Sequence, residues 1–313
     1  MNIFVRMALE ERARKTITQE AGDEDDIAFA DGMHGPEQKE QFLTSDVAFG
    51  NVPAAWLEET DRLQWLQLES VGFTPYQEVA PGRSFTLTNL KGFFGTPVAE
   101  TILAGVLALY RGVDTLVELK SERAWRKMEV RPALRTLHGQ RAVILGSGSI
   151  GRALKRLLRA FSCPVTVFAN SAPEADIYTP SELDEALTNA DVVAACLPDT
   201  PDTRNLFDRR RLALLPERAV FVNVGRGSVV DEEALTRALQ DERLGGAVLD
   251  VTREEPLPET HPLWHCPNTI LTQHTAGGTA DETEQKVHFF LDNLSRFRDG
   301  ETLLNVVDFE RGY

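Results

Sequence analysis

The chain has 313 residues, of which 42% are hydrophobic and 26% charged, so it has the composition of a globular protein long enough for two domains. Its net charge of −15 argues against nucleic-acid binding, which depends on a basic surface. No apolar run approaches the roughly 18 residues of a membrane span. Residues 1–15 lack the apolar core and cleavage site of a signal peptide. We therefore expect a cytoplasmic protein that binds neither nucleic acid nor a membrane.

The first hundred residues predict a small α/β unit. Residues 53–62 resemble a helix, and the expected strands are residues 2–9, 26–30, 46–50 and 63–70. Residues 99–119 have the pattern of one long amphipathic helix that crosses into a second unit, and residues 281–298 predict a helix that returns. We therefore expect a discontinuous domain of residues 1–96 and 283–313, interrupted by an inserted domain of residues 97–282.

The inserted domain alternates short apolar runs with helical patterns. The runs are almost continuously apolar, as in parallel strands covered on both faces: residues 142–145, 165–168, 191–195, 219–224, 246–251 and 269–273. After Gly151, Leu154, Leu157, Leu158 and Phe161 follow one helical stripe. Repeated β-α units predict a doubly wound parallel sheet.

A glycine-rich turn follows the first of these runs. Gly146, Gly148 and Gly151 form a GxGxxG pattern between a strand and a helix, the context that dinucleotide binding requires. Gly146 permits the tight turn, Gly148 lets the backbone approach a pyrophosphate, and Gly151 allows close packing. The helix N-terminus, with Ser149 and Ile150, offers N–H groups to phosphates, and Arg152 adds charge.

The second strand usually ends in an acidic residue that binds the adenosine ribose. Residues 169–171 contain no carboxylate, and Asn170 and Ser171 are polar groups able to bind a 2′-phosphate. However, no Arg or Lys lies between Arg159 and Arg204. The cofactor is therefore NADP or NAD, and the missing acid favours NADP slightly.

Three ionisable residues follow successive strands: Arg226, Glu255 and His274. Because ligands of open α/β sheets bind beyond the carboxyl ends of strands, we expect the three to face one crevice. Reduction of a 2-keto acid needs an acid near neutral pKa, which suits His, and a carboxylate that orients the imidazole. An Arg can hold the substrate carboxylate and polarise its keto oxygen.

With these motifs in place, the chain resembles the D-isomer-specific 2-hydroxyacid dehydrogenase family. The match covers most of the inserted domain and includes residues 214–232 around Arg226, 249–257 around Glu255, 262–276 around His274, and 195–203. The variant of these motifs is most similar to the glyoxylate/hydroxypyruvate reductase branch. The resemblance implies a Rossmann cofactor domain inserted into a smaller flavodoxin-like substrate domain, a homodimer, and D-specific chemistry on small 2-keto or 2-hydroxy acids.

The resemblance also implies roles for single residues. Arg226 would bind substrate, Glu255 would pair with His274, and His274 would be the acid/base. Val71 and Gly72 resemble the loop whose N–H groups receive the substrate carboxylate, and Asp250 would contact the nicotinamide carboxamide. The remaining expected cofactor contacts are Leu197, Pro198, Thr203, Val224 and Gly277.

Several alternatives stay open from the sequence. Phe73 and Tyr76 replace a polar stretch of the family and either line a more apolar pocket or pack the domain. A nucleotide-sensing protein could keep the same fold and residues without turnover. Cys163, Cys196 and Cys266 are expected to be reduced thiols. His261, His265 and Cys266 lie close together, but no second ligand group accompanies them, so we expect no metal site.

Overall fold

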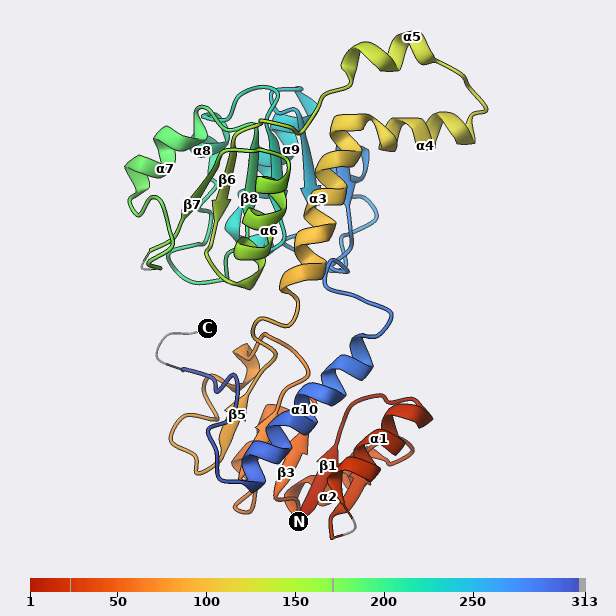
Figure 1. Ribbon diagram of the computed structural model, residues 1–313, viewed down its shortest axis with the longest axis vertical. Helices are drawn as coiled ribbons and strands as arrows, with labels where there is room; N and C mark the ends of the chain where they lie inside the picture. Colours follow the sequence, from red (N-terminus) through yellow and green to blue (C-terminus); the bar gives the residue numbers. More distant parts are fainter. Residues whose placement is uncertain (23, 171, 310–313) are drawn as a thin grey trace. The chain divides into compact units, whose positions relative to one another are not determined.

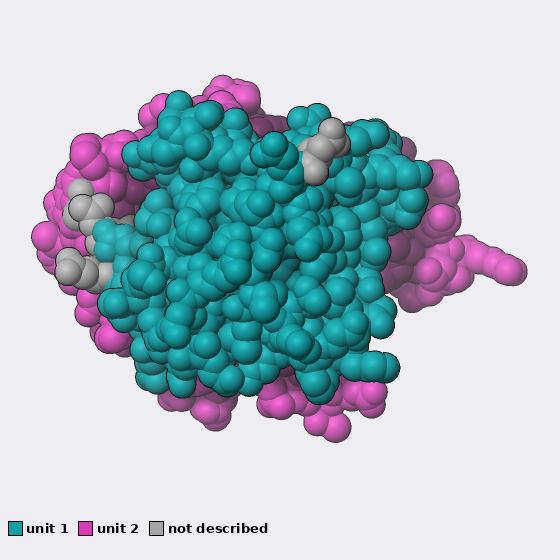
Figure 2. Space-filling model, turned by 90° about the horizontal axis from the view of Figure 1, so that it is seen from below, with its two compact units in different colours: residues 1–91, 279–313 teal, residues 92–278 magenta. Residues whose placement is uncertain are grey.

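The computed structural model describes residues 1–22, 24–170 and 172–309. The chain divides into two compact units, Met1–Lys91 with Thr279–Tyr313, and Gly92–Gly278 (Figures 1 and 2). Each unit contains its own parallel sheet. This arrangement confirms the predicted α/β fold class, in which one doubly wound unit interrupts another.

The first unit has a five-stranded parallel sheet in the order β2-β1-β3-β4-β5, the strand order of flavodoxin. Its strands are β1 (Asn2–Val5), β2 (Asp26–Phe29), β3 (Val47–Phe49), β4 (Trp65–Gln67) and β5 (Thr86–Thr88). The first four confirm predicted segments, although each is shorter. Strand β5, which pairs with β4 and is only three residues long, was not predicted from the sequence.

Helices α1 (Glu11–Ala21), α2 (Gly35–Leu43) and α10 (Glu282–Arg298) cover this sheet, with short 3-10 turns η1 (Ala54–Glu58) and η2 (Thr74–Tyr76). Helix α10 confirms the predicted return helix. Its Phe290 ring stacks on Phe49 at 4.5 Å and on Trp65 at 5.3 Å. The predicted helix over residues 53–62 is wrong in extent, since only η1 forms there.

The second unit has a six-stranded parallel sheet in the order β11-β10-β9-β8-β6-β7. All six strands confirm predicted runs: β6 (Ala142–Leu145), β7 (Val165–Phe168), β8 (Val192–Ala195), β9 (Val220–Asn223), β10 (Gly246–Leu249) and β11 (Thr269–Leu271). The chain runs outward from β6 to β7 and then returns to β8 on the other side of β6. The carboxyl ends of β6 and β8 therefore flank the point where ligands bind in such sheets.

The helices and turns of this unit are α3 (Gly95–Arg111), α4 (Val113–Ser121), α5 (Lys127–Val130), η3 (Arg131–Ala133), α6 (Ser149–Ala160), α7 (Pro180–Leu187), α8 (Arg209–Leu212), η4 (Gly227–Val229), α9 (Glu232–Gln240) and η5 (Pro262–His265). The single helix predicted over residues 99–119 is wrong. It breaks at Gly112, whose left-handed φ of 61° ends α3 and starts α4 in a new direction.

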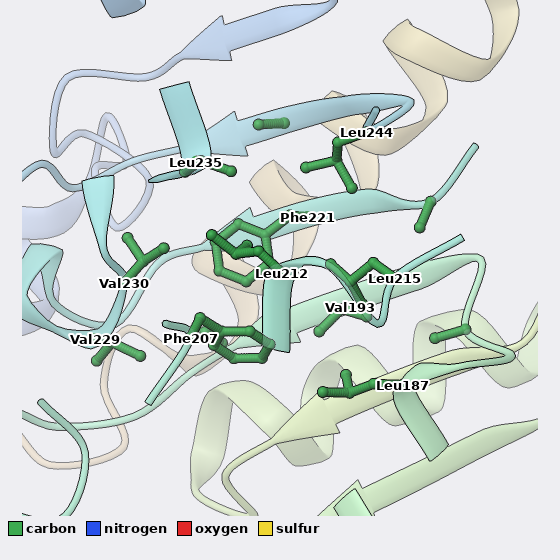
Figure 3. Close-up of a cluster of buried hydrophobic side chains, with 14 of the residues drawn as sticks. Leu187, Val193, Phe207, Leu212, Leu215, Phe221, Val229, Val230, Leu235 and Leu244 are labelled. Carbon is green, nitrogen blue, oxygen red and sulfur yellow. The ribbon is translucent and has the colours of Figure 1, made fainter. Parts of the chain in front are cut away.

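Alternate residues of the central strands enter two different apolar cores. Val193 and Phe221 belong to one core and Val192 and Val220 to the other, on the opposite face of the sheet. Figure 3 shows the first core, where Phe207 meets Phe221 edge to face at a centroid distance of 4.8 Å. Burial on both faces explains why these strands are continuously apolar.

Candidate functional site

The glycine loop after β6 has the geometry of a phosphate cradle. A Cβ on Gly146 would meet the Cys196 carbonyl oxygen at 2.6 Å, and one on Gly151 would meet the Gly146 carbonyl oxygen at 2.0 Å. A Cβ on Gly148 would meet no atom within 4 Å, so the outer face of this residue is open. Gly148 also precedes α6 without a side-chain cap, which leaves the first-turn N–H groups of Ser149 and Ile150 for a ligand. The loop therefore fits a dinucleotide pyrophosphate.

A cation lies beside the loop that follows β7. Arg152 donates to the Ser147 carbonyl oxygen at 2.8 Å and pairs with Glu174 at 3.3 Å. The loop itself contains no Arg or Lys, and its positive charge comes from Arg152, which belongs to α6. Asn170 is exposed at the end of β7. The predicted contact from Ser171 lies outside the described residues.

Glu255 and His274 form a carboxylate–imidazole pair. The Oε2 atom of Glu255 lies 2.6 Å from Nδ1 of His274, and the Thr252 N–H donates to Oε1 of Glu255 at 3.1 Å. The side chains of Glu255 and His274 remain 38% and 55% exposed, so the imidazole can meet a ligand from solvent. The contact with Glu255 can hold the His274 ring in one orientation, with Nε2 left for a ligand.

Asp250 holds the turn that carries His274. Its Oδ1 accepts from the Thr272 hydroxyl at 2.6 Å and from the N–H groups of Thr275 and Ala276 at 3.0 Å each. Its carbonyl oxygen accepts from the His274 N–H at 2.6 Å. Gln273 and His274 both have left-handed φ, 54° and 56°, which these bonds stabilise. Asp250 thus braces the histidine, besides the cofactor contact expected of it.

Arg226 lies on a segment whose two flanking glycines allow close packing against neighbouring loops. A Cβ on Gly225 would meet the Leu197 carbonyl oxygen at 2.4 Å, and one on Gly227 would meet the Thr252 carbonyl oxygen at 2.0 Å. Arg226 itself is exposed and donates to the Gly225 carbonyl oxygen at 2.7 Å. The segment therefore lies between the loop at Leu197 and the loop of Glu255.

The loop after β8 is closed by Thr203. Its hydroxyl donates to the Pro198 carbonyl oxygen at 2.7 Å and accepts from the Thr200 N–H at 2.9 Å. Nearby, Arg204 donates to Asp199 at 2.9 Å, and this hydrogen bond lowers the pKa of Asp199. Two further residues were expected to contact the cofactor: Val224 is buried directly after β9, and a Cβ on Gly277 would meet the Phe94 ring at 2.8 Å.

In the first unit, the loop after β4 has free N–H groups. The Val71 carbonyl oxygen accepts from Asn89 at 2.8 Å and the Gly72 carbonyl oxygen from Ser70 at 2.9 Å. Among the described residues, no hydrogen-bond acceptor is found for the N–H groups of Val71 and Gly72. Phe73 and Tyr76 are 5% and 3% exposed and belong to the core of the unit, so they pack the domain rather than line a pocket.

A cavity of about 500 Å³ opens beside the Glu255–His274 pair. Its apolar wall is formed by Leu249, Pro256, Leu257, Trp264 and Leu271, and its polar wall by Asp250, Thr252, Glu255, Gln273 and His274. Arg226 does not line it. Four residues that shape the site were not predicted from the sequence: Thr252, Thr272, Gly225 and Gly227. Gly225 and Gly227 lie in the segment 214–232 that resembles the family, but the sequence assigned them no role of their own.

The cysteines are all free thiols, as expected from the sequence. Over residues 1–22, 24–170 and 172–309, no group of three or more His, Cys, Asp or Glu side chains is placed to hold a metal ion. In the same part of the chain, no helix combines the length and apolar character needed to cross a bilayer.

A dinucleotide cradle and an imidazole–carboxylate pair, both at the carboxyl ends of strands of one parallel sheet, define the class of nicotinamide-dependent oxidoreductases. Residues 103–276 match the model of the NAD-binding domain of D-isomer specific 2-hydroxyacid dehydrogenases. The chain belongs to the D-isomer specific 2-hydroxyacid dehydrogenase family, whose enzymes are NAD(P)-dependent.

Relatives and solved structures agree with this assignment. The chain is 31% identical to a glyoxylate/hydroxypyruvate reductase B from Klebsiella pneumoniae over 94% of its own length and 88% of the relative's. A family protein from Aeromonas salmonicida superposes with a TM-score of 0.86 at 28% identity, covering 98% of this chain and 99% of the other. A Xanthobacter autotrophicus family member, solved with NADPH and MES, superposes at 0.80 with 27% identity, covering 100% and 99%.

Proposed function

We propose that this enzyme reduces small 2-keto acids to D-2-hydroxy acids, with glyoxylate and hydroxypyruvate as favoured substrates. The observation that carries the proposal is the 2.6 Å contact between Glu255 and His274. This pair follows the carboxyl ends of strands in the same parallel sheet as the strand that leads into the glycine loop. The reductase names of the relatives support the choice of substrate.

The chain's own residues supply binding and proton transfer. When bound, the reduced nicotinamide supplies a hydride to C2 of the keto acid. His274, oriented by Glu255, donates a proton from Nε2 to the substrate oxygen as negative charge develops there. Arg226 binds the substrate carboxylate and polarises the keto group. In the first unit, which we assign as the substrate domain, the N–H groups of Val71 and Gly72 bind the substrate.

A substrate-by-cofactor panel tests the activity. We expect oxidation of NADPH or NADH with glyoxylate or hydroxypyruvate, and slower reaction with pyruvate and phenylpyruvate, followed by the absorbance of the reduced nicotinamide. Tight nucleotide binding without turnover of any 2-keto acid would instead favour a nucleotide-sensing protein.

The histidine assignment has its own test. His274→Ala should reduce turnover by roughly a thousandfold or more, because the proton donor is lost. Cofactor affinity should stay nearly constant, since His274 follows β11 and the strands β10, β9 and β8 separate β11 from the strand that carries the glycine loop. Turnover that survives in this variant would contradict the role of His274.

We propose a preference for NADP over NAD. The proposal is supported by the lack of a carboxylate at residues 169–171 and by Arg152, which reaches the loop after β7. Arg152→Ala should therefore raise the KM for NADPH more than that for NADH. A specificity constant that favours NADH in the unmodified enzyme would refute the preference.

We also propose a cytoplasmic homodimer. Figure 1 shows α4 and α5 extending from the body of their unit as an arm. Five of the nine large apolar side chains exposed among the described residues lie on it: Val113, Leu116, Val117, Trp125 and Met128. A second copy would cover such a patch. Trp125→Glu with Met128→Glu should convert a dimer to a monomer in size-exclusion chromatography with light scattering, whereas an unchanged mass would contradict the proposed interface.

A further inference from the structure

A second carboxylate–imidazole pair lies behind the loop that carries Glu255. Glu232 is the first residue of α9, and its side chain is only 10% exposed. Its Oε2 accepts from the Arg253 N–H at 2.8 Å, and its Oε1 lies 3.3 Å from Nε2 of His261. The Leu263 N–H donates to Nδ1 of His261 at 3.3 Å, which places the proton of a neutral ring on Nε2, facing Glu232.

We propose that Glu232 is a positioning residue that fixes the loop of Glu255 and thereby keeps Glu255 in contact with His274. The inference rests on the proposed function, because it concerns the same acid–base pair. Glu232 contacts Arg253 and His261, the two residues that bracket positions 254–260. It therefore restrains the Glu255 loop on both sides.

The loop depends on such contacts because it has no regular secondary structure between residues 252 and 261. Inside it, the Thr252 N–H donates to Glu255. Towards its end, the Pro258 carbonyl oxygen accepts from the indole of Trp264 in η5 at 2.9 Å. The Glu232 carboxylate attaches the start of the loop directly to α9, by accepting from the Arg253 N–H.

Glu232 also links this loop to the Arg226 segment. Five residues separate Arg226 from Glu232 along one continuous segment, and Gly227 within it packs against the backbone of Thr252. The carboxylate thus sets the separation between Arg226 and Glu255. A carboxyl group buried to this extent loses much of its hydration, and an apolar residue would pack there at lower cost. This cost is explained if the carboxylate specifies geometry.

Glu232→Gln tests the inference. The amide can accept from the Arg253 N–H or satisfy His261, but it cannot reproduce both bonds with the tautomer that Leu263 requires. We expect kcat to fall by about tenfold to a hundredfold, because a misplaced catalytic group slows the reaction steeply. The Kd for NADPH should stay within about twofold, since Glu232 lies outside the glycine loop. The matched control is Glu233→Gln, an exposed neighbour that pairs with Arg237 one turn along the helix and should keep full activity.

The decisive measurement repeats Glu232→Gln in the Glu255→Gln background. A residue that acts through Glu255 should have little further effect there, within about twofold in kcat. A second full loss would show a general structural role and overturn the inference, as would an unchanged kcat in the single variant.

A second pair of variants keeps the test valid if Glu232→Gln does not fold. His261→Leu should lower kcat, and His261→Gln, whose amide can donate to Glu232, should restore most of it; equal losses in both would count against the inference. If the unmodified enzyme turns over 2-keto acids and His274→Ala does not, but these variants keep full kcat, the proposed function stands and the role of Glu232 is wrong. An unmodified enzyme without turnover overturns both.

Discussion

Two glycines of the phosphate cradle, Gly148 and Gly151, should have separable effects on binding and on folding. Gly148 has φ of −66°, which alanine adopts freely, and open space where its Cβ would lie. Gly148→Ala should therefore leave the free energy of unfolding within about 0.5 kcal/mol of the original value. The added methyl group would point into the space that a pyrophosphate occupies.

Gly151 presents the opposite case. Its Cβ would lie 2.0 Å from the Gly146 carbonyl oxygen and 3.1 Å from the Gly146 carbonyl carbon, so the backbone itself must move. Overpacking of this kind costs about 1–3 kcal/mol, and contact with backbone puts Gly151→Ala at about 3 kcal/mol. For a unit of this size, that corresponds to a decrease in Tm of roughly 6–12 °C.

Urea unfolding and NADPH fluorescence titration measure the two effects separately. We expect Gly148→Ala to raise the Kd for NADPH by about tenfold to a hundredfold, equivalent to roughly 1.4–2.7 kcal/mol, while stability is kept. Gly151→Ala should lower stability even without cofactor. Normal NADPH binding by Gly148→Ala, or normal stability of Gly151→Ala, would refute the assignment of these glycines.

Three further predictions concern other parts of the chain. Arg226→Lys should raise the substrate KM and lower kcat by about tenfold, because lysine keeps the charge but not the bidentate geometry; equal steady-state kinetics would contradict this role. Tyr76→Phe should cost about 1 kcal/mol at neutral pH by removing the bond to the Val52 carbonyl oxygen. Burial raises the pKa of Tyr76 to about 12, so the original protein should lose stability as pH rises from 10 to 12, and Tyr76→Phe should lose less in urea unfolding across that range. Hydrogen bonding from Arg210 lowers the pKa of Asp184, so its contribution to stability is present above about pH 4 and is lost as pH falls further. Asp184→Asn should therefore reduce the fall in the free energy of unfolding between pH 5 and pH 2. An unchanged fall would show that the ion pair contributes nothing to stability.

The sequence predicted the parallel strands of the second unit because burial on both faces leaves an uninterrupted apolar run, which is a local signal. It predicted the glycine loop for the same reason, since a tight turn and close packing restrict the residue type at single positions. It also predicted that Glu255 and His274 would meet, because parallel strands bring their carboxyl ends to one edge.

Contacts between distant residues were decided only by the tertiary structure. Strand β5 was missed because three residues carry almost no periodicity; it is fixed by Thr88, which bonds with Trp65 and Gln67 across the sheet. The break at Gly112 was missed because a glycine inside an apolar helical pattern does not by itself show a change of direction. The contacts of Arg152 with Glu174 and of Glu232 with His261 join segments more than twenty residues apart. Such contacts depend on where whole helices and loops pack, and no local pattern in the sequence records that.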